Sequence, residues 1–376
     1  MQDSFFSNPN KNYLLDTKQT YKAIKFDKIL GAWIVTGFTE SQQILNDSDS
    51  FSTQSYLEFQ PDISRIHMFL LASKEDHSRL RKILKQCFSP QRLELLKNQV
   101  LIPTADKLAS DLPLGIKFDI IHKYIEPYFK KSIYSIIGVN SLEGDELVAT
   151  LKVAYKYFEK EDKYSHRGQA SLQILYELAR NICKYSKHNQ NVGLIQFIHN
   201  QKLIREISFD EMVCFILSFF ETLAFKVQRD LPATLIKLIG ISETSLQQKL
   251  QDNSKLLFDA ADEAVRLQNG SFVPRIATKD TKIGETTILQ GSKVFILLGK
   301  ANKDEQIFQH PYQFDPCRKN VTQHLGFGTG LHICPAKNLA KLIAVTSVQA
   351  LLKKSYLINL IGAKEKKIDV ILNHIY

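Results

Sequence analysis

Apolar residues recur at helical spacing along most of this chain, and this pattern dominates residues 89–267. Short β-branched and apolar runs flanked by glycine occupy residues 31–36 and 293–298, and they predict strands. Turn residues within 281–291 predict a β-hairpin. The fold class that follows is mainly α with a small β region.

One predicted helix combines a start signal with an unusual polar pair. Ser208 and Glu211 have the spacing of a capping box, and the apolar run after them is long enough for a core helix. Glu221 and Thr222 place an acid and a hydroxyl in this run, where burial without partners is costly. The hydroxyl can bond back to its own helix, and the carboxylate can reach solvent or a salt bridge. The pair alone therefore does not identify a site.

Composition favours one globular domain. The 376 residues, 44% of them hydrophobic and 10% aromatic, suffice for a large core and an apolar pocket. No linker, repeat or low-complexity tract divides them, so we expect a single domain over residues 1–376. The N-terminus lacks a signal-peptide pattern, and no apolar run reaches the length of a membrane span. We expect a soluble protein.

The cysteines and the charge narrow the setting further. The cysteines show no CxxC pair, which disfavours both a disulfide framework and a zinc ribbon and favours a reducing cytoplasm. They are Cys87, Cys183, Cys214, Cys317 and Cys334. The net charge of +10 admits nucleic acid as a partner, but no recognition motif is present, so we expect none. A generally basic surface and a docking site for an acidic protein explain the charge equally well.

The segment 324–340, HLGFGTGLHICPAKNLA, carries the candidate chemistry. Cys334 lies at what the pattern indicates is a helix start, where free N–H groups and a partial positive charge lower a thiol pKa and favour a thiolate metal ligand. Gly328 and Gly330 let the chain turn beneath a flat ligand, and Phe327 can pack against the sulfur. A buried structural cysteine or a phosphate-binding loop fits the same residues.

This segment resembles the haem-ligand loop of the cytochrome P450 family, in which a cysteine thiolate binds haem iron. The matching pattern is Phe-Gly-x-Gly-x-His-x-Cys, with Phe327, His332 and Cys334 at its key positions. Ala336 stands where the family usually has glycine, and Pro335 has no N–H to donate to the sulfur. The resemblance implies the P450 fold, with haem b between a long distal helix and the cysteine loop.

Further segments match the family in order and rough spacing. His77 and Arg81 are four residues apart, so a helix presents them on one face, and they match a pair that grips a haem propionate. Arg275 and His332 match further propionate contacts. Four donor or cationic side chains would then face the two haem carboxylates.

The resemblance also assigns a structural pair. Glu263 and Arg266 match the Glu-x-x-Arg ion pair that lies buried behind the haem, where both partners must be kept. The family often adds an arginine in a Pro-x-Arg-Phe stretch, and this chain has Gln313 there. We therefore expect a less cationic network around Glu263.

Glu221 and Thr222 match the acid–alcohol pair that delivers protons during oxygen activation, and they are the predicted catalytic residues. Phe219 replaces the glycine that the family normally has two residues before the acid. A ring there is expected to narrow or redirect the distal groove. By the same resemblance, residues 59–71 and 270–274 line the substrate pocket, which we expect to be apolar and aromatic. The predicted pocket residues are Phe219, Phe220, Phe272 and Val273.

The resemblance implies a haem-thiolate monooxygenase that inserts one atom of O2 into a hydrophobic small molecule, free or carrier-bound, in specialised metabolism. Electrons would come from NAD(P)H through a reductase and an acidic ferredoxin or flavodoxin. The expected docking cations are Arg79, Lys82, Lys85, Lys337 and Lys341. Because of Phe219, a peroxide-driven enzyme and a non-catalytic haem-binding protein stay open as alternatives. A basic nucleic-acid binder without haem is a third.

Overall fold

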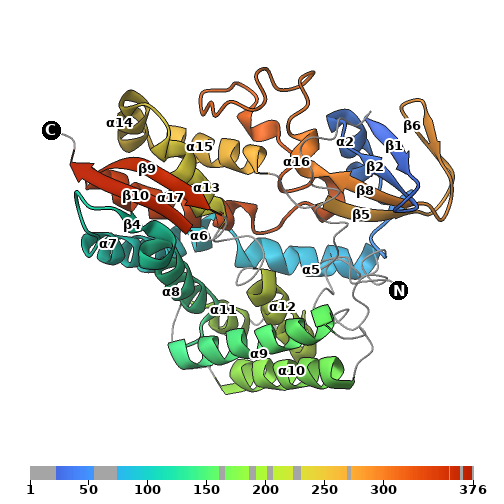
Figure 1. Cartoon of the computed structure of the whole chain (residues 1–376). Helices are drawn as coiled ribbons and strands as arrows, with labels where there is room; N and C mark the ends of the chain where they lie inside the picture. The colour runs from blue at the N-terminus through green and yellow to red at the C-terminus, as the bar shows by residue number, and fades with distance from the viewer. Residues whose placement is uncertain are drawn as a thin grey trace.

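Helices hold most of the residues that the structure describes, as the apolar pattern predicts (Figure 1). The computed structural model describes residues 23–54, 74–160, 166–185, 192–200, 206–222, 230–268, 272–354, 356–364 and 367–374. The longer helices are α2 (Phe38–Asn46), α5 (Lys74–Cys87), α6 (Pro90–Leu96), α7 (Ile102–Ser110), α8 (Glu126–Ile137), α9 (Ser141–Lys160), α10 (His166–Tyr185), α11 (Leu194–Asn200), α12 (Phe209–Glu221), α13 (Asp230–Gly240), α14 (Thr244–Asp252), α15 (Ser254–Leu267) and α17 (Lys337–Lys353).

Short helical turns connect several of these elements. They are the π-helical η2 (Lys97–Leu101) and η3 (Ile121–Ile125), the four-residue α16 (Leu298–Ala301), and the 3₁₀ turns η7 (Val321–Gln323) and η8 (Gly330–His332). The last of these belongs to the cysteine loop. Among the described residues, no helix is long and apolar enough to cross a membrane.

The largest sheet has the strand order β1-β2-β8-β5-β3. Its strands are β1 (Ile24–Asp27), β2 (Ala32–Val35), β3 (Phe51–Ser52), β5 (Phe272–Ala277) and β8 (Lys293–Leu297). Strands β2 and β8 confirm the two predicted strands, and they pair in parallel, whereas the other pairs are antiparallel. The predicted hairpin is also present as β6 (Thr281–Ile283) and β7 (Thr286–Ile288), and Gly284 turns it with a φ of 54°.

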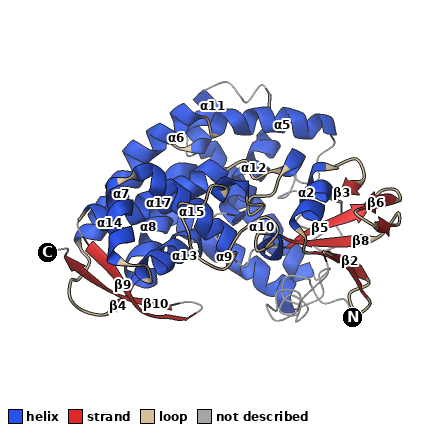
Figure 2. Ribbon diagram, turned by 90° about the horizontal axis from the view of Figure 1, so that it is seen from above, coloured by secondary structure: helices blue, strands red, loops and turns tan. Residues whose placement is uncertain are grey.

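A second sheet, of order β4-β10-β9, lies near the C-terminus of the chain. Its strands are β4 (Phe118–Asp119), β9 (Tyr356–Lys364) and β10 (Lys367–His374). This sheet is not among the sequence predictions. Figure 2 shows the two groups of strands at opposite ends of the molecule, with the helices between them.

The main hydrophobic core lies among the helices, and α17 is buried along most of its length. Two buried tyrosines donate hydrogen bonds from their hydroxyl groups to backbone carbonyls of this helix. The hydroxyl of Tyr124 donates to the carbonyl of Ser347 at 2.6 Å, and that of Tyr128 donates to the carbonyl of Ile343 at 3.2 Å. Burying each ring contributes on the order of 2 kcal/mol, and the bonds remove the penalty of a buried free hydroxyl. The helix that follows the cysteine loop is therefore firmly held.

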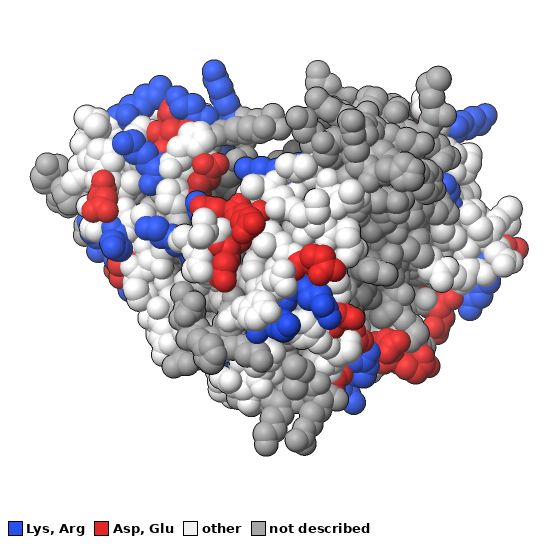
Figure 3. All heavy atoms as spheres, turned by 90° about the horizontal axis from the view of Figure 1, so that it is seen from below, with Lys and Arg blue, Asp and Glu red and all other residues white. Residues whose placement is uncertain are grey.

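The largest sheet has its own smaller clusters of buried residues on either side. Because side chains alternate along a strand, Phe272 and Arg275 of β5 point to opposite faces. Phe272 packs with Ala32 and Phe295, whereas Val273 shares the face of Arg275. On the side of the molecule drawn in Figure 3, basic and acidic side chains are interspersed, so the net positive charge is not concentrated there. The single domain over residues 1–376 stays a prediction.

Candidate functional site

The cysteine loop runs into α17 through a set of short backbone contacts. The N–H of Cys334 donates to the carbonyl of Phe327 at 2.9 Å. Helix α17 begins at Lys337 with Ala336 as its N-cap, so the cysteine precedes the helix by three residues. Gly328 and Gly330 have φ values of 68° and 72°, which other residues rarely adopt. These two glycines give the loop the tight turn that the sequence predicts.

The thiol of Cys334 experiences opposing influences. Burial raises its pKa, and the N–H of Ala336 and the charges of Arg81 and Lys337 act in the other direction. The prediction that the helix start lowers the pKa of Cys334 is therefore wrong, because the effect of burial outweighs the effects that lower the pKa. As expected, Pro335 donates no hydrogen bond, and the N–H of Ala336 is the backbone group that reaches the sulfur.

Helix α5 brings His77 and Arg81 to this loop. Arg81 donates from Nη2 to the carbonyl of Ile333 at 2.6 Å, immediately before the cysteine. The buried ring of His77 lies edge to face against the ring of His332, with centroids 4.8 Å apart. The i,i+4 pair of the sequence therefore points at the cysteine loop from one helix face.

Strand β5 contributes Arg275 to the same place. Its side chain is buried, and Nη1 donates to the carbonyl of Pro274 at 2.8 Å. Burial, together with the charges of Arg275, His77 and Arg81, lowers the pKa of His332 to about 4. Three segments that lie far apart in the sequence thus place the four predicted donor residues around one point beside the loop.

These donors fit an anionic ligand. The Nδ1 atoms of His77 and His332 are buried and have no hydrogen-bond partner among the described residues. Buried polar atoms are normally paired, so such orphans indicate a missing acceptor. Two arginines beside them add positive charge. The arrangement matches the carboxylates of a haem, which accept hydrogen bonds and neutralise the cations.

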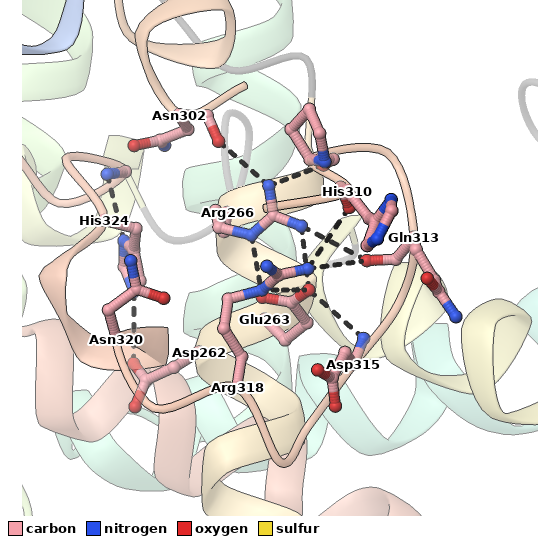
Figure 4. A network of polar contacts seen from close by, with 12 residues as sticks. Asp262, Glu263, Arg266, Asn302, His310, Gln313, Asp315, Arg318, Asn320 and His324 are labelled. Atoms are coloured by element: carbon pink, nitrogen blue, oxygen red, sulfur yellow. Dashed lines mark hydrogen bonds and ion pairs between the residues drawn. The ribbon is translucent and has the colours of Figure 1, made fainter. Parts of the chain in front are cut away.

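A buried ion-pair network lies behind the loop (Figure 4). Glu263 and Arg266 of α15 are both fully buried, and two parallel bonds of 2.7 Å join them. Arg318 adds a second guanidinium, with Nε 3.3 Å from Glu263. The Nη1 atom of Arg266 also donates to the carbonyls of Asn302 and Pro311 at 2.9 and 2.6 Å.

The expectation of a less cationic network is therefore wrong. The side chain of Gln313 is exposed, and only its carbonyl takes part, as an acceptor for Arg266 and Arg318 at 3.3 Å each. Arg318, five residues further on, supplies the charge. Arg318 was missed because nothing in its local spacing indicates that the loop returns it to Glu263.

A second buried cluster adjoins the first. Asp262 of α15 accepts from His324 at 3.2 Å and from Lys341 of α17 at 3.0 Å. The Nδ1 atom of His324 accepts the N–H of Gly326 at 3.1 Å, and its ring lies 5.7 Å from that of Phe327. Neither Asp262 nor His324 was predicted as a site residue. The position of Asp262 next to Glu263 was the available signal.

Helix α12 carries the predicted acid–alcohol pair at its C-terminal end. The capping box of Ser208 and Glu211 is confirmed at its start. Glu221 is the last residue of α12 and is buried, and Thr222 is the exposed C-cap. The predicted catalytic roles of both residues stay predictions.

The predicted pocket residues lie in different surroundings. Phe219 stacks on Phe88 at 5.3 Å, just beyond the end of α5. Phe220 is fully buried and stacks on Tyr134 of α8 at 6.4 Å. Phe272 contacts Phe295 at 5.7 Å. Both Phe220 and Phe272 thus have core partners, and these contacts do not support a pocket role.

Val273 shares the strand face of Arg275, so it stays a candidate for the pocket. Residues 59–71 lie outside the described residues, as does most of the stretch before β5.

The predicted docking cations also differ from one another. Arg79 forms ion pairs with Glu211 at 2.5 Å and Asp76 at 3.0 Å, and Lys341 is held by Asp262. Lys82 and Lys85 are exposed, and Lys337 is half-buried near Cys334. The five cations therefore do not form one free surface.

Comparisons with known proteins agree with this geometry. A family model described as Cytochrome P450 matches residues 226–357, which include the Glu263 network and the cysteine loop. The biotin biosynthesis cytochrome P450 of Bacillus subtilis is 28% identical over 95% of this chain and 91% of its own length. Cytochrome P450 107B1 of Saccharopolyspora erythraea is 26% identical over 94% and 89%.

The fold is likewise similar to solved structures. The structure of P450BioI in complex with hexadec-9Z-enoic acid ligated acyl carrier protein superimposes with a TM-score of 0.81. The two chains are 24% identical, and the match covers 98% of this chain and 99% of the other.

Proposed function

Because the chain belongs to the cytochrome P450 family and is a P450 monooxygenase by homology, we propose that Cys334 is its haem-iron ligand and that it oxidises a hydrophobic small molecule. The reaction would insert one atom of O2 by hydroxylation or epoxidation, or would join two substrate atoms by oxidative coupling, in which case both oxygen atoms leave as water. The observation that supports this most strongly is the meeting of His77, Arg81, Arg275 and His332 beside the cysteine loop.

The residues around the loop have separate roles in the proposal. His77, Arg81, Arg275 and His332 would hold the haem propionates, and Phe327 would shield the sulfur from water. Bound haem would supply the redox chemistry of oxygen activation. The cations near Cys334 favour the thiolate form, which burial alone disfavours.

We assign proton delivery to Glu221 and Thr222. A carboxyl group and a hydroxyl in series can pass a proton inward from solvent. Glu221 is buried and Thr222 is exposed at the end of α12, so the two side chains lie in different environments along one helix end.

The substrate is proposed as a hydrophobic molecule, free or carrier-bound. The likeness to the biotin biosynthesis enzyme, and to a fold solved with an acyl carrier protein, makes fatty acyl chains the first class to test. Substrate binding next to a bound haem would be visible as a change in its absorption spectrum. A panel of fatty acids, their carrier-bound forms, terpenoids and aromatic amino acids would rank the classes.

The proposed electron donor is an acidic ferredoxin or flavodoxin, reduced by NAD(P)H through its reductase. Lys82, Lys85 and Lys337 are the cations not held in a described ion pair, so they are the first docking candidates. Charge reversal at Lys82 and Lys85 should slow the reduction rate and weaken its dependence on salt. The five free cysteines agree with a reducing cytoplasm, which the proposal includes.

The first test is the absorption spectrum of the reduced protein under carbon monoxide. A strongly red-shifted Soret band that disappears in Cys334→Ala supports thiolate ligation. A band unaffected by the substitution, or purified protein without haem, would refute the assignment. Product formation with a surrogate ferredoxin and reductase then tests turnover.

One observation favours a second candidate, a peroxide-driven or non-catalytic haem protein. Phe219 occupies the position of the usual glycine, and its ring is fixed by Phe88 and Phe215. A helix without glycine at this point has less freedom to open an oxygen groove. Turnover with hydrogen peroxide but not with reduced ferredoxin would support the peroxide route.

A further inference from the structure

Asp262 connects the two ends of the cysteine loop. One carboxylate oxygen lies 3.2 Å from Nε2 of His324, ten residues before Cys334, and the other lies 3.0 Å from Nζ of Lys341, seven residues after it. Asp262 and His324 are buried, and Lys341 is mostly buried. A single side chain of α15 thus spans the loop from behind.

The hydrogen bonds assign the state of His324. Because its Nδ1 accepts the N–H of Gly326 at 3.1 Å, that nitrogen carries no proton. The ring is therefore the neutral tautomer with the proton on Nε2, which it donates to Asp262. The carboxylate thus orients the imidazole (Figure 4). The imidazole in turn orients Gly326.

This orientation is transmitted to the sulfur through one residue. Gly326 precedes Phe327, whose carbonyl accepts the N–H of Cys334 at 2.9 Å and whose ring lies beside that of His324. On the other side, Lys341 lies in the second turn of α17. Asp262 is therefore linked to the chain on both sides of Cys334, through His324 before it and through Lys341 after it.

The loop depends on such attachments because its own sequence is permissive. Gly328 and Gly330 both have positive φ, and glycine leaves the backbone many alternative conformations. A thiolate ligand must be held within about 0.5 Å of its productive position. Fixing the two ends of the loop limits the conformations that the glycines allow.

We propose that Asp262 is a positioning residue for the proposed haem thiolate: it sets the depth of Cys334 by holding His324 and Lys341 at the two ends of the loop. This inference rests on the proposed function. The side chain of Asp262 does not touch the sulfur, and its role is separate from that of Glu263, which holds Arg266 and Arg318.

The test compares holoprotein variants by their reduced carbon monoxide spectra. Asp262→Ala removes both attachments, and we expect a several-fold larger share of the unshifted Soret band, which reports a lost or protonated thiolate. Asp262→Asn keeps an acceptor for His324 but leaves Lys341 without a carboxylate. Its share of the unshifted Soret band should therefore lie between those of the unsubstituted protein and Asp262→Ala. If Asp262→Ala does not retain haem, the comparison rests on Asp262→Asn and Lys341→Met.

Tyr124→Phe is the matched control, because it removes a buried hydrogen bond to α17 far from the loop. Thermal unfolding midpoints are measured for every variant. The proposal is supported if Asp262 variants change the band ratio and Tyr124→Phe, at a similar loss in midpoint, does not. It is overturned if the ratio stays native in the Asp262 variants, or if the control changes it equally. A native protein without the shifted band would instead refute the proposed function.

Discussion

The imidazole rings of His77 and His332 meet edge to face, with centroids 4.8 Å apart, although one belongs to α5 and the other to the cysteine loop. Both buried Nδ1 atoms have no hydrogen-bond partner among the described residues. The two rings therefore pack against each other and still keep the Nδ1 atoms that we propose for ligand binding.

Replacing His77 by phenylalanine should preserve the packing and remove the donor. We expect haem to dissociate about five to ten times faster, as loss of one buried hydrogen bond predicts. The measurement is the rate of haem transfer to a scavenging apoprotein. Ser78→Ala, at the exposed neighbouring position, is the control and should leave this rate unchanged. Equal rates in both variants would contradict the propionate assignment.

Arg318→Gln should destabilise the fold by about 3 kcal/mol, because the buried Glu263 then loses one of its two guanidinium partners. Gln313→Ala, in the same loop, should change the free energy of unfolding by less than about 0.5 kcal/mol, since only the carbonyl of Gln313 is used. Urea unfolding of both variants checks the difference. A similar loss of unfolding free energy in the two variants would show that the conformation of the loop, and not the charge of Arg318, stabilises the fold.

Glu211→Gln should destabilise the protein at neutral pH by about 0.5 to 1 kcal/mol, the range for a partly exposed pair. Glutamine keeps an acceptor for the N–H of Ser208 but loses the ion pair with Arg79. The pair with Arg79 lowers the pKa of Glu211 in the folded state. Its contribution is therefore complete above about pH 4.3 and is lost as the pH falls through the lowered value.

Unfolding free energies of Glu211→Gln and the unsubstituted protein should thus converge in acid. Asp76→Asn is the control, because Asp76 is the more exposed partner of Arg79. It should lose less than about 0.5 kcal/mol. A Glu211→Gln deficit that persists unchanged to low pH would argue against an ionic contribution.

Gly144→Ala should destabilise the packing of α9 on α8. A Cβ at Gly144 would lie 2.6 Å from carbons of the Tyr134 ring. Alanine in a helix normally gains about 1 kcal/mol over glycine, but overpacking costs about 1 to 3 kcal/mol, so the clash should dominate. Thermal unfolding measures the result. Gly362→Ala, which has open space around its Cβ, should not lower the midpoint.

Thr222→Ala should uncouple electron transfer from product formation several-fold if the pair with Glu221 delivers protons. The measurement is the ratio of product and hydrogen peroxide to NAD(P)H consumed. Thr222→Ser keeps the hydroxyl and should retain coupling. Unchanged coupling in Thr222→Ala would favour the peroxide-driven alternative that Phe219 suggests.

The family resemblance, together with helical spacing, predicted the parts of the site that depend on one helix or loop. His77 with Arg81, and Glu263 with Arg266, are fixed by helical periodicity, and the structure places both pairs as expected. Arg318 could not be found in this way, since it reaches Glu263 from 55 residues away along an irregular loop.

The orientation of apolar residues was equally inaccessible. Phe220 and Phe272 are hydrophobic in either a pocket or a core, and only the rotation of α12 and the pleat of β5 decide between them. The parallel pairing of β2 with β8 also has no local signal, because it depends on where the intervening helices return the chain.

That pairing has a consequence for biosynthesis. It joins residues more than 250 positions apart, so β2 leaves the ribosome long before its partner is made. At about 5 to 20 residues per second, β2 waits roughly 10 to 50 s for β8, with only β1 available as a strand partner. Arg275 is made late in this interval, and Cys334 is made after it. The residues that we propose to hold haem are complete only once Cys334 has been made, so haem capture should be a late step, and chaperones that shield nascent strands should raise the yield of coloured protein.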